Sequence, residues 1–187
     1  MLGQWDLRPA ETNMAKKKKS VAKTMPMRML DEKGIPYEVR QQAGKEYTAE
    51  GVAKDLGVPV AQVVKAMLVQ RSASSGQGRS VFILIVIPGD RRLSLKKVGE
   101  ILADKKIQMA SQRDVQRVTG YQVGAVSVLG FRRDDVPTYV DKHVLELEHV
   151  IISAGRPDIG LALPPTDMVQ AIGDVQIDDL CENMGYE

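Results

Sequence analysis

The chain has 187 residues, of which 43% are hydrophobic and only 4% aromatic, so its core must consist mostly of aliphatic side chains. The single cysteine, Cys181, excludes an intrachain disulfide and a zinc site built on several thiolates. The longest uncharged apolar run, Val81–Ile87, is far shorter than the ~20 residues of a membrane-spanning helix. No charged-then-apolar leader opens the chain, so we expect a soluble cytoplasmic protein that does not act at a membrane.

The net charge of +2 conceals a strong asymmetry along the chain. Residues 91–133 hold ten basic and three acidic side chains, whereas residues 134–187 hold two basic and twelve acidic ones. A basic middle beside an acidic end is typical of a protein that meets phosphate groups on one face. Solvated charges on helices would give the same pattern, so charge alone leaves both interpretations open.

Residues 1–19 lack periodicity and contain the run Lys16–Lys19. Four consecutive lysines repel one another and bury nothing, so we expect a disordered basic tail that precedes a single domain over residues 20–187.

Helix signals begin at Thr24, which can cap a helix that ends before Gly34. Residues 35–39 alternate as a short edge strand would. A second helix is expected from Thr48 to Gly57.

Two apolar runs, residues 63–69 and 81–87, flank a polar, glycine-bearing segment over residues 71–79. This pattern predicts a hairpin. The second run is apolar at every position, as in a strand that is covered on both faces, so helices must pack outside the sheet.

The remaining elements are shorter. Ser94 predicts a helix to about Lys105, and a capping box at Ser111 predicts another that ends near Gly120. Strands are expected at 139–141, 150–153 and 161–163, followed by a helix over 165–172. Helices and strands alternate without a regular repeat, which favours an α/β fold with a mixed sheet.

The common catalytic signatures are absent. The sequence has no Gly-x-Ser-x-Gly elbow, no phosphate-binding loop and no His-Glu-x-x-His motif. His143 and His149 are six residues apart, which fits no known ligand spacing, so we expect no metal and no cofactor. Cys181 lies among acidic residues, which keep a thiol protonated, so a nucleophilic role is not expected.

Three features nevertheless indicate a site. Lys65 shares a strand face with Val63 and Met67, so its amine must reach the rim, find an anion or lose its charge. It could also be a strand-edge residue that opposes aggregation. The uncharged segment 120–130 carries three glycines, which can aim N–H groups at a carbonyl or phosphate oxygen or kink a buried strand. The end of the strand at residues 153–155 could wall a pocket.

In this order and spacing, these segments resemble the YbaK/EbsC family of free-standing aminoacyl-tRNA deacylases, which are relatives of the editing domain of bacterial prolyl-tRNA synthetases. Residues 63–69 are similar to the family's strand with a pocket lysine. Residues 120–130 resemble its Gly-Tyr-x-x-Gly-Gly-x-Ser-Pro-x-Gly loop, residues 137–141 its Pro-Thr-x-x-Asp segment, and residues 153–156 its Ser-Gly-Gly-Lys turn.

The resemblance implies an α/β fold in which a mixed, partly closed, barrel-like sheet is surrounded by helices. It implies removal of a wrongly attached amino acid from the 3′ end of tRNA, typically cysteine from proline tRNA. The catalytic residues that it implies are Lys65, Gly124, Ser127 and Gly130, and the substrate-binding residues are Tyr121, Ala125, Asp141, Ser153 and Gly155.

In such a site, loop N–H groups would polarise the ester carbonyl, and Lys65 would hold the terminal phosphate or the carbonyl end. Ser127 would position the substrate without attacking it. The family relies on groups of the substrate, including the ribose 2′-hydroxyl, in place of a protein base.

The expected partners are aminoacyl-tRNA and a prolyl-tRNA synthetase that would help to select the tRNA, with no role for DNA. We expect the basic segment to contact the tRNA backbone and the acidic segment after Asp134 to face away from it. The tRNA-binding residues predicted from the basic pairs are Arg91, Arg92, Lys96, Lys97, Lys105 and Lys106, with Arg132 and Arg133 at the end of the same segment.

The sequence departs from the family pattern at three places. Ala125 replaces a glycine, Val128 replaces a proline, and the turn Arg156–Asp158 replaces a Lys-x-Gly pattern. Two alternatives therefore stay open: an inactive module that binds tRNA or a synthetase, and a hydrolase that acts on small aminoacyl esters without RNA.

Overall fold

The computed structural model describes residues 22–43, 46–71, 81–131 and 135–182. These residues form a mixed α/β domain with two sheets and five α-helices. The predicted tail over residues 1–19 lies outside the described residues. Among the helices of the described part, none has the length and apolar character needed to cross a membrane.

The larger sheet has five strands in the order β4-β2-β3-β5-β8. The strands β2 (Lys65–Arg71) and β3 (Val81–Ile87) pair antiparallel, as the two apolar runs predicted. β4 (Ile107–Met109) adds antiparallel to β2, whereas β5 (Thr138–Asp141) and β8 (Val175–Asp178) add parallel beyond β3. The sheet is therefore mixed.

The smaller sheet is antiparallel, in the order β1-β7-β6. Its strands are β1 (Glu38–Gln41), β6 (Val150–Arg156) and β7 (Ile159–Leu163). The two sheets meet at one isolated bridge between Val63 and Ile151, where the Val64 N–H donates to the Ile151 carbonyl at 3.2 Å. Partial closure of the sheets into a barrel stays a prediction.

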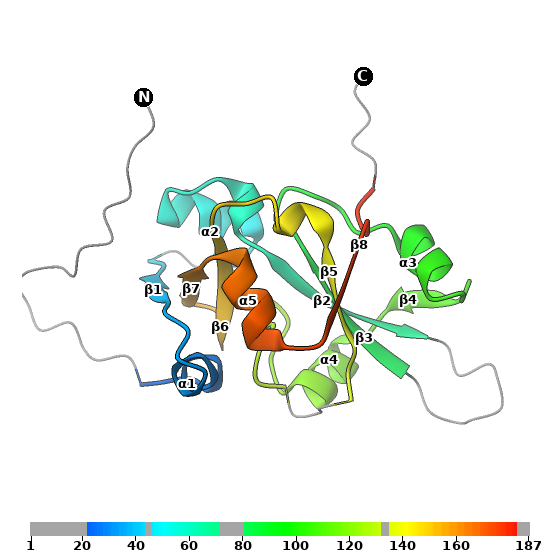
Figure 1. Cartoon of the computed structure of the whole chain (residues 1–187), viewed down its shortest axis with the longest axis horizontal. Helices are drawn as coiled ribbons and strands as arrows, with labels where there is room; N and C mark the ends of the chain where they lie inside the picture. Colours follow the sequence, from blue (N-terminus) through cyan, green and yellow to red (C-terminus); the bar gives the residue numbers. More distant parts are fainter. Residues whose placement is uncertain (1–21, 44–45, 72–80, 132–134, 183–187) are drawn as a thin grey trace, which may run out of the picture.

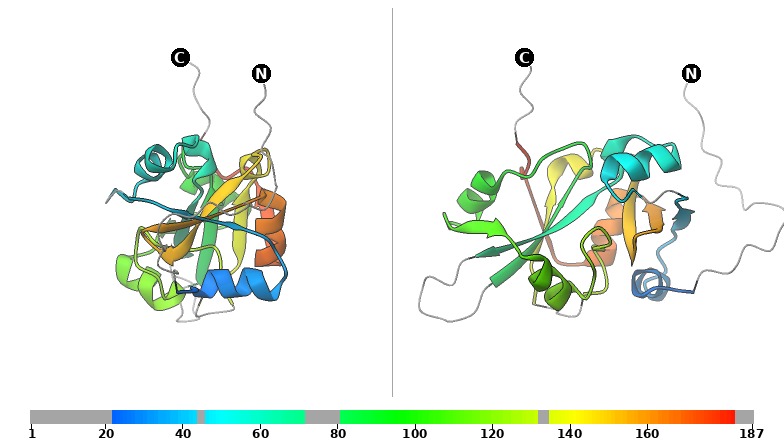
Figure 2. Two further views of the ribbon diagram at one scale, coloured as in Figure 1. Left: turned by 90° about the vertical axis from the view of Figure 1, so that its left-hand side faces the viewer. Right: turned by 180° about the vertical axis from the view of Figure 1, so that it is seen from behind.

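Five helices cover the sheets (Figures 1 and 2). α1 (Met25–Glu32) and α5 (Pro165–Ile172) bury Met27, Leu30, Met168 and Ala171 in a core that the two sheets share. α3 (Leu95–Ile101) and α4 (Gln112–Thr119) pack on the larger sheet through Val98, Val115 and Val118, and α2 (Ala49–Leu56) packs through Ala53 against Val63. α3 and β4 form one end of the molecule, and α1 and β1 form the other (Figure 1).

The predicted helix ends are confirmed where a capping side chain and a glycine bracket the helix. The Thr48 hydroxyl accepts from the Gly51 N–H at 3.1 Å, and Gly57 ends α2 in the left-handed region. The Ser111 hydroxyl accepts from the Asp114 N–H at 3.1 Å, and Gly120 ends α4 in the same way. Such caps satisfy the terminal N–H and C=O groups that a helix leaves unpaired.

Several boundaries differ from the predictions; the apolar run 63–69, for example, becomes a strand over Lys65–Arg71. The edge strand covers residues 38–41, not 35–39, and it is a sheet edge as expected. The helix that begins after Ser94 ends at Ile101, because Ala103 adopts a positive φ of 50°. The chain then enters β4, which the sequence did not indicate.

Candidate functional site

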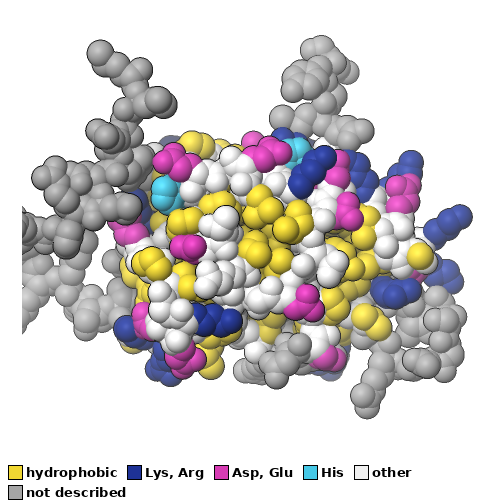
Figure 3. Space-filling model, in the orientation of Figure 1, with side chains coloured by type: hydrophobic (Ala, Val, Ile, Leu, Met, Phe, Trp, Pro, Cys, Tyr) yellow, Lys and Arg dark blue, Asp and Glu magenta, His cyan; other side chains and the backbone are white. Residues whose placement is uncertain are grey.

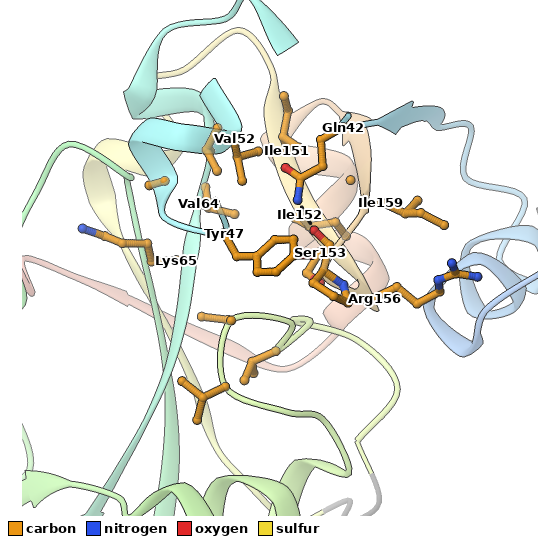
Figure 4. A pocket seen from close by; sticks show the side chains of 18 of the residues that line it. Gln42, Tyr47, Val52, Val64, Lys65, Ile151, Ile152, Ser153, Arg156 and Ile159 are labelled. Atoms are coloured by element: carbon orange, nitrogen blue, oxygen red, sulfur yellow. Dashed lines mark hydrogen bonds between the residues drawn. The ribbon is translucent and has the colours of Figure 1, made fainter. Parts of the chain in front are cut away.

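A cavity of about 250 Å³ lies where the two sheets meet, between the start of β2, the α2 helix, the segment 120–130 and the β6–β7 hairpin (Figure 4). Most of its wall is aliphatic, and its polar side chains come from separate parts of the chain. The residues that line it are Gln42, Tyr47, Ala49, Val52, Val63, Val64, Lys65, Ala66, Met67, Val123, Gly124, Val126, Ile151, Ile152, Ser153, Arg156, Pro157, Ile159 and Gly160.

Lys65 lines this cavity at its rim, and its amine donates a hydrogen bond to the Arg91 carbonyl. Figure 4 shows the amine pointing away from Gln42 and Ser153. Burial lowers the pKa of Lys65, while the carboxylate of Glu50 acts in the opposite direction. Arg92 is close enough to lower the pKa further. The lysine therefore connects the cavity with a basic turn after β3.

The segment 120–130 is a series of turns without strand structure, so it is not a glycine-kinked strand. Tyr121 holds it in place, because its hydroxyl donates to the Leu129 carbonyl at 2.7 Å and to that of Gly130 at 3.2 Å. Burial raises the pKa of Tyr121 to about 12. A Cβ on Gly130 would lie 2.7 Å from the Tyr121 hydroxyl, and one on Gly155 would lie 2.5 Å from its ring. The two glycines thus leave space for this tyrosine.

Several residues of this loop were predicted to belong to the site, and of these Gly124 lines the cavity. Its φ is +88°, a backbone angle that residues with a side chain rarely adopt. Among the described residues its N–H has no hydrogen-bond acceptor. Ala125 and Ser127 are buried behind the wall, where the Ser127 hydroxyl accepts from the Leu129 N–H at 3.3 Å. Neither they nor Gly130 line the cavity.

Ser153, at the end of β6, lies in the cavity wall. Its hydroxyl donates to the Ala125 carbonyl at 3.0 Å and accepts from the Gly155 N–H at 3.1 Å. Ser153 therefore ties the hairpin to the glycine-bearing loop. Gly155 itself, with φ of +81°, contacts Tyr121 instead of the cavity.

Asp141 is fully buried and lies outside the cavity wall. Its carboxylate accepts from the N–H groups of Leu180 and Cys181 at 2.8 and 3.1 Å, and from the His143 N–H and Nδ1 at 3.0 and 2.7 Å. Burial alone would raise the pKa of Asp141, but these hydrogen bonds outweigh it and lower the pKa. Such contacts favour a structural role, namely holding the C-terminal segment against β5.

The predicted tRNA-binding residues lie in the turn after β3, on α3 and just after that helix. Figure 3 shows Lys and Arg side chains at the end of the molecule formed by α3 and β4. Arg91 and Arg92 lie beside Lys65, Lys96 and Lys97 are on α3, and the exposed Lys105 and Lys106 follow that helix. Arg132 and Arg133 lie outside the described residues.

The acidic segment does not face away from the basic one throughout. Asp179 accepts from Lys97 at 2.8 Å and forms an ion pair with Lys142 at 3.0 Å. These two lysines lower the pKa of Asp179 to about 2. The expectation is wrong here because the backbone of Arg92–Ser94 hydrogen bonds with that of Leu180–Glu182, which brings the two segments side by side.

The sequence profile of the family described as the aminoacyl-tRNA editing domain matches residues 44–171. The chain belongs to this family.

Relatives of the editing domain include a free-standing protein. EbsC of Enterococcus faecalis, named as a proposed Cys-tRNA(Pro)/Cys-tRNA(Cys) deacylase, is 30% identical over 151 residues, which are 80% of this chain and 88% of EbsC. The proline–tRNA ligase of Thermosipho africanus is 27% identical over 111 residues, which are 59% of this chain but only 18% of the ligase. The similarity to the ligase is thus confined to a small part of that enzyme.

Two solved structures share the fold of this chain. The hypothetical protein APE2540 superimposes with a TM-score of 0.73 and 26% identity, covering 83% of this chain and 97% of that protein. A proposed trans-editing enzyme for prolyl-tRNA synthetase gives a TM-score of 0.71 at 24% identity, covering 83% and 93%, and shares the fold.

Two of the positions at which the sequence analysis expected a departure from the family pattern lie away from the cavity. Ala125 and Val128 are buried in the core, and among described residues only Ala103 and glycines have a positive φ, so Ala125 does not need to be glycine. The turn Arg156–Asp158 is different, because Arg156 and Pro157 line the cavity.

The sequence analysis missed two polar residues of the cavity, Gln42 and Tyr47. Both precede α2, in a stretch without periodic or motif signal. Tyr47 is 45% exposed and lines the cavity. The signal that could have indicated Tyr47 is an aromatic residue next to the predicted helix cap, Thr48.

Proposed function

We propose that this protein is a trans-editing aminoacyl-tRNA deacylase that hydrolyses Cys-tRNA(Pro) in the cytoplasm. The observation that carries the proposal is the convergence of Lys65, Gly124 and Ser153, from three separate segments, on one small cavity in a chain of the editing-domain family. A volume of about 250 Å³ is large enough to receive an aminoacyl end.

The reaction is the hydrolysis of an ester. The oxygen of a water molecule bonds to the carbonyl carbon, the bond from that carbon to the terminal ribose oxygen breaks, and the ribose oxygen leaves with a proton. Among the described residues that line the cavity there is no Asp, Glu or His. The proton transfer therefore falls to groups of the substrate, such as the adjacent ribose hydroxyl.

The backbone N–H of Gly124 is the protein's candidate for stabilising the negative charge that develops on the carbonyl oxygen. It lies in the cavity wall and has no acceptor among the described residues. Donors that are held in place before the reaction stabilise such a charge without reorganising. Ser127, buried behind the wall, supports the loop and forms no covalent intermediate.

Lys65 binds the terminal phosphate in this proposal, in preference to the carbonyl end. Its amine donates to the Arg91 carbonyl and lies near enough to Arg92 for that charge to act on it, so Lys65 and Arg92 form a basic entrance. The exposed Lys96, Lys105 and Lys106 continue this surface and contact phosphate and sugar, which supplies affinity with little sequence information. Selection of proline tRNA then depends on the attached amino acid or on an associated prolyl-tRNA synthetase.

A deacylation assay tests the function. The purified protein is incubated with Cys-tRNA(Pro), Ala-tRNA(Pro) and Pro-tRNA(Pro), and the expected result is rapid loss of cysteine with Pro-tRNA(Pro) spared. Binding without hydrolysis of any of the three would favour the inactive module. Hydrolysis of small cysteinyl esters at a rate independent of salt would favour a small-molecule hydrolase, because phosphate contacts weaken steeply as salt rises.

A further inference from the structure

Among the described residues of the cavity wall, Gln42 carries the one buried side-chain polar atom without a hydrogen-bond partner. The side chain is 7% exposed, and its Oε1 has no hydrogen-bond partner. A buried acceptor without a donor costs about 1–3 kcal/mol, so it is retained where a ligand supplies the donor.

The orientation of this amide is fixed by its other end. The Gln42 Nε2 donates to the carbonyl of Pro157, which can only accept. Exchanging the oxygen and the nitrogen would place two acceptors together, so the oxygen must be the free end. In Figure 4 this oxygen points toward Val52 and Ile151, and the nitrogen points toward the hairpin turn.

Gln42 and Lys65 lie at opposite sides of the cavity (Figure 4). If the terminal phosphate and ribose lie near Lys65, the amino acid extends toward Gln42. Around Gln42 the wall is aliphatic, with Val52, Ile151 and Ile159, which suits a small side chain. The α-ammonium group is bonded to the same carbon atom as this side chain. An amide oxygen can accept a hydrogen bond from it.

The charge near Gln42 does not oppose an ammonium group. Arg156 also lines this side, but its guanidinium is paired with the Asp158 carboxylate through contacts of 3.0 and 2.9 Å. The partner of Gln42, Pro157, lies in the turn between β6 and β7, so the position of the amide is fixed by the hairpin.

We propose that Gln42 binds the free α-ammonium group of the aminoacyl ester and thereby restricts the enzyme to aminoacyl-tRNA with an unblocked amine. The proposal rests on the deacylase function. N-acylated esters, including peptidyl-tRNA, would leave the amide oxygen without its charged donor and would have to fit an acyl group beside Pro157.

The test compares Ala-tRNA(Pro) with N-acetyl-Ala-tRNA(Pro), and uses Cys-tRNA(Pro) as a third substrate. The wild-type protein should hydrolyse the free-amine ester at least tenfold faster than the acetylated one, since hydrogen bonds to charged groups are the stronger ones. Gln42→Met should slow hydrolysis of both free-amine esters about tenfold and leave the acetylated ester nearly unchanged. Gln41→Met, at the exposed neighbouring position, should match the wild type.

Three results would overturn the proposal. The first is that the wild-type protein hydrolyses the free-amine and the acetylated esters at equal rates. The second is that Gln42→Met slows hydrolysis of these two esters equally. The third is that Gln42→Met slows only the cysteinyl ester, which would show that the thiol, not the amine, donates to Gln42.

A second measurement separates this proposal from the function on which it rests. Amide-linked alanyl-adenosine and its N-acetyl derivative bind without being hydrolysed, and wild-type protein should bind the free amine at least tenfold more tightly. If no tRNA is deacylated but this preference is present, the function fails and the role of Gln42 stands. Equal binding of the two compounds contradicts the role of Gln42.

Discussion

Two buried polar sites in this protein differ in how completely they are satisfied. At the end of β5, the Asp141 carboxylate accepts four hydrogen bonds from Leu180, Cys181 and His143. In the cavity, the Gln42 amide has one partner, Pro157, and a free oxygen. A fully satisfied buried group holds elements together, whereas an unsatisfied one is available for a ligand.

This difference also separates two residues that the family pattern presents alike. Asp141 and Lys65 both belong to segments that resemble the deacylases, yet Asp141 lies outside the cavity wall and Lys65 lies within it. We therefore propose that the first residue contributes to stability and the second to substrate binding. The predictions below test that division, beginning with the largest expected effect.

Removing the carboxylate of Asp141 should cost stability and not catalysis. Asp141→Ala leaves the N–H groups of Leu180 and Cys181 buried without acceptors, so the free energy of unfolding should fall by about 3 kcal/mol or more. Denaturant titration measures this, with the exposed Asp174→Ala as control. A loss no larger than that of the control would remove the structural assignment.

The same carboxylate predicts a pH dependence. Because its pKa is lowered in the folded protein from an ordinary value of 3.8, its contribution to stability is complete above pH ~4 and disappears as the pH falls through the lowered pKa. The stability difference between wild type and Asp141→Asn should therefore shrink on acidification below pH ~4. A difference that stays constant to pH ~2 would contradict the lowered pKa.

Removing the amine of Lys65 should, unlike the loss of the Asp141 carboxylate, impair catalysis and not stability. Lys65→Met should reduce deacylation at least tenfold, equivalent to about 1.4 kcal/mol of transition-state stabilisation. Burial lowers the pKa of Lys65, so loss of its charge should leave thermal stability unchanged or raise it. Lys54→Met, exposed on α2, is the matched control for both measurements. Full activity of Lys65→Met would show that the lysine has no role in the reaction.

Tyr121 is expected to be intermediate, because it anchors the loop that carries Gly124. Tyr121→Phe removes the hydrogen bonds to Leu129 and Gly130 and should lower the free energy of unfolding by about 1 kcal/mol. The midpoint of denaturant unfolding measures this. Tyr139→Phe should change it much less, since among the described residues the Tyr139 hydroxyl has no hydrogen-bond partner, and equal losses would refute the anchoring role.

The smallest effect is expected on the basic surface. Neutralising Lys105 and Lys106 together should weaken binding of every tRNA about equally and reduce the slope of log affinity against log salt by up to ~2. Neither residue lies at the cavity, so the chemical step at saturating tRNA should be unaffected. Unchanged affinity and slope would exclude this end of the molecule from the tRNA contact.

Much of the fold was accessible from the sequence, because its signals are local. Thr48 with Gly57, and Ser111 with Gly120, mark helix ends through hydrogen bonds and backbone angles of nearby residues. β4 and β8 lack such signals, since three- and four-residue segments become strands only by pairing with β2 and β5.

The site was accessible only in part, for a similar reason. Strand alternation correctly grouped Lys65 with Met67, but it does not reveal that this face turns toward Arg91. Gln42 and Tyr47 carry no motif, and their position in the cavity follows from the way the two sheets meet at Val63 and Ile151. Long-range pairing of this kind has no counterpart in a local sequence pattern.

The central claim is that the cavity between the two sheets receives the aminoacyl end of tRNA. Its most direct test is the rate of Cys-tRNA(Pro) hydrolysis by Val52→Phe, which places a larger side chain in the cavity wall, compared with Ile177→Phe, an exposed position on β8 outside it. We predict a rate at least tenfold below wild type for Val52→Phe, with tRNA affinity and unfolding temperature retained, and a wild-type rate for Ile177→Phe. Equal, wild-type rates for both variants would contradict the claim and place the reaction elsewhere on the protein.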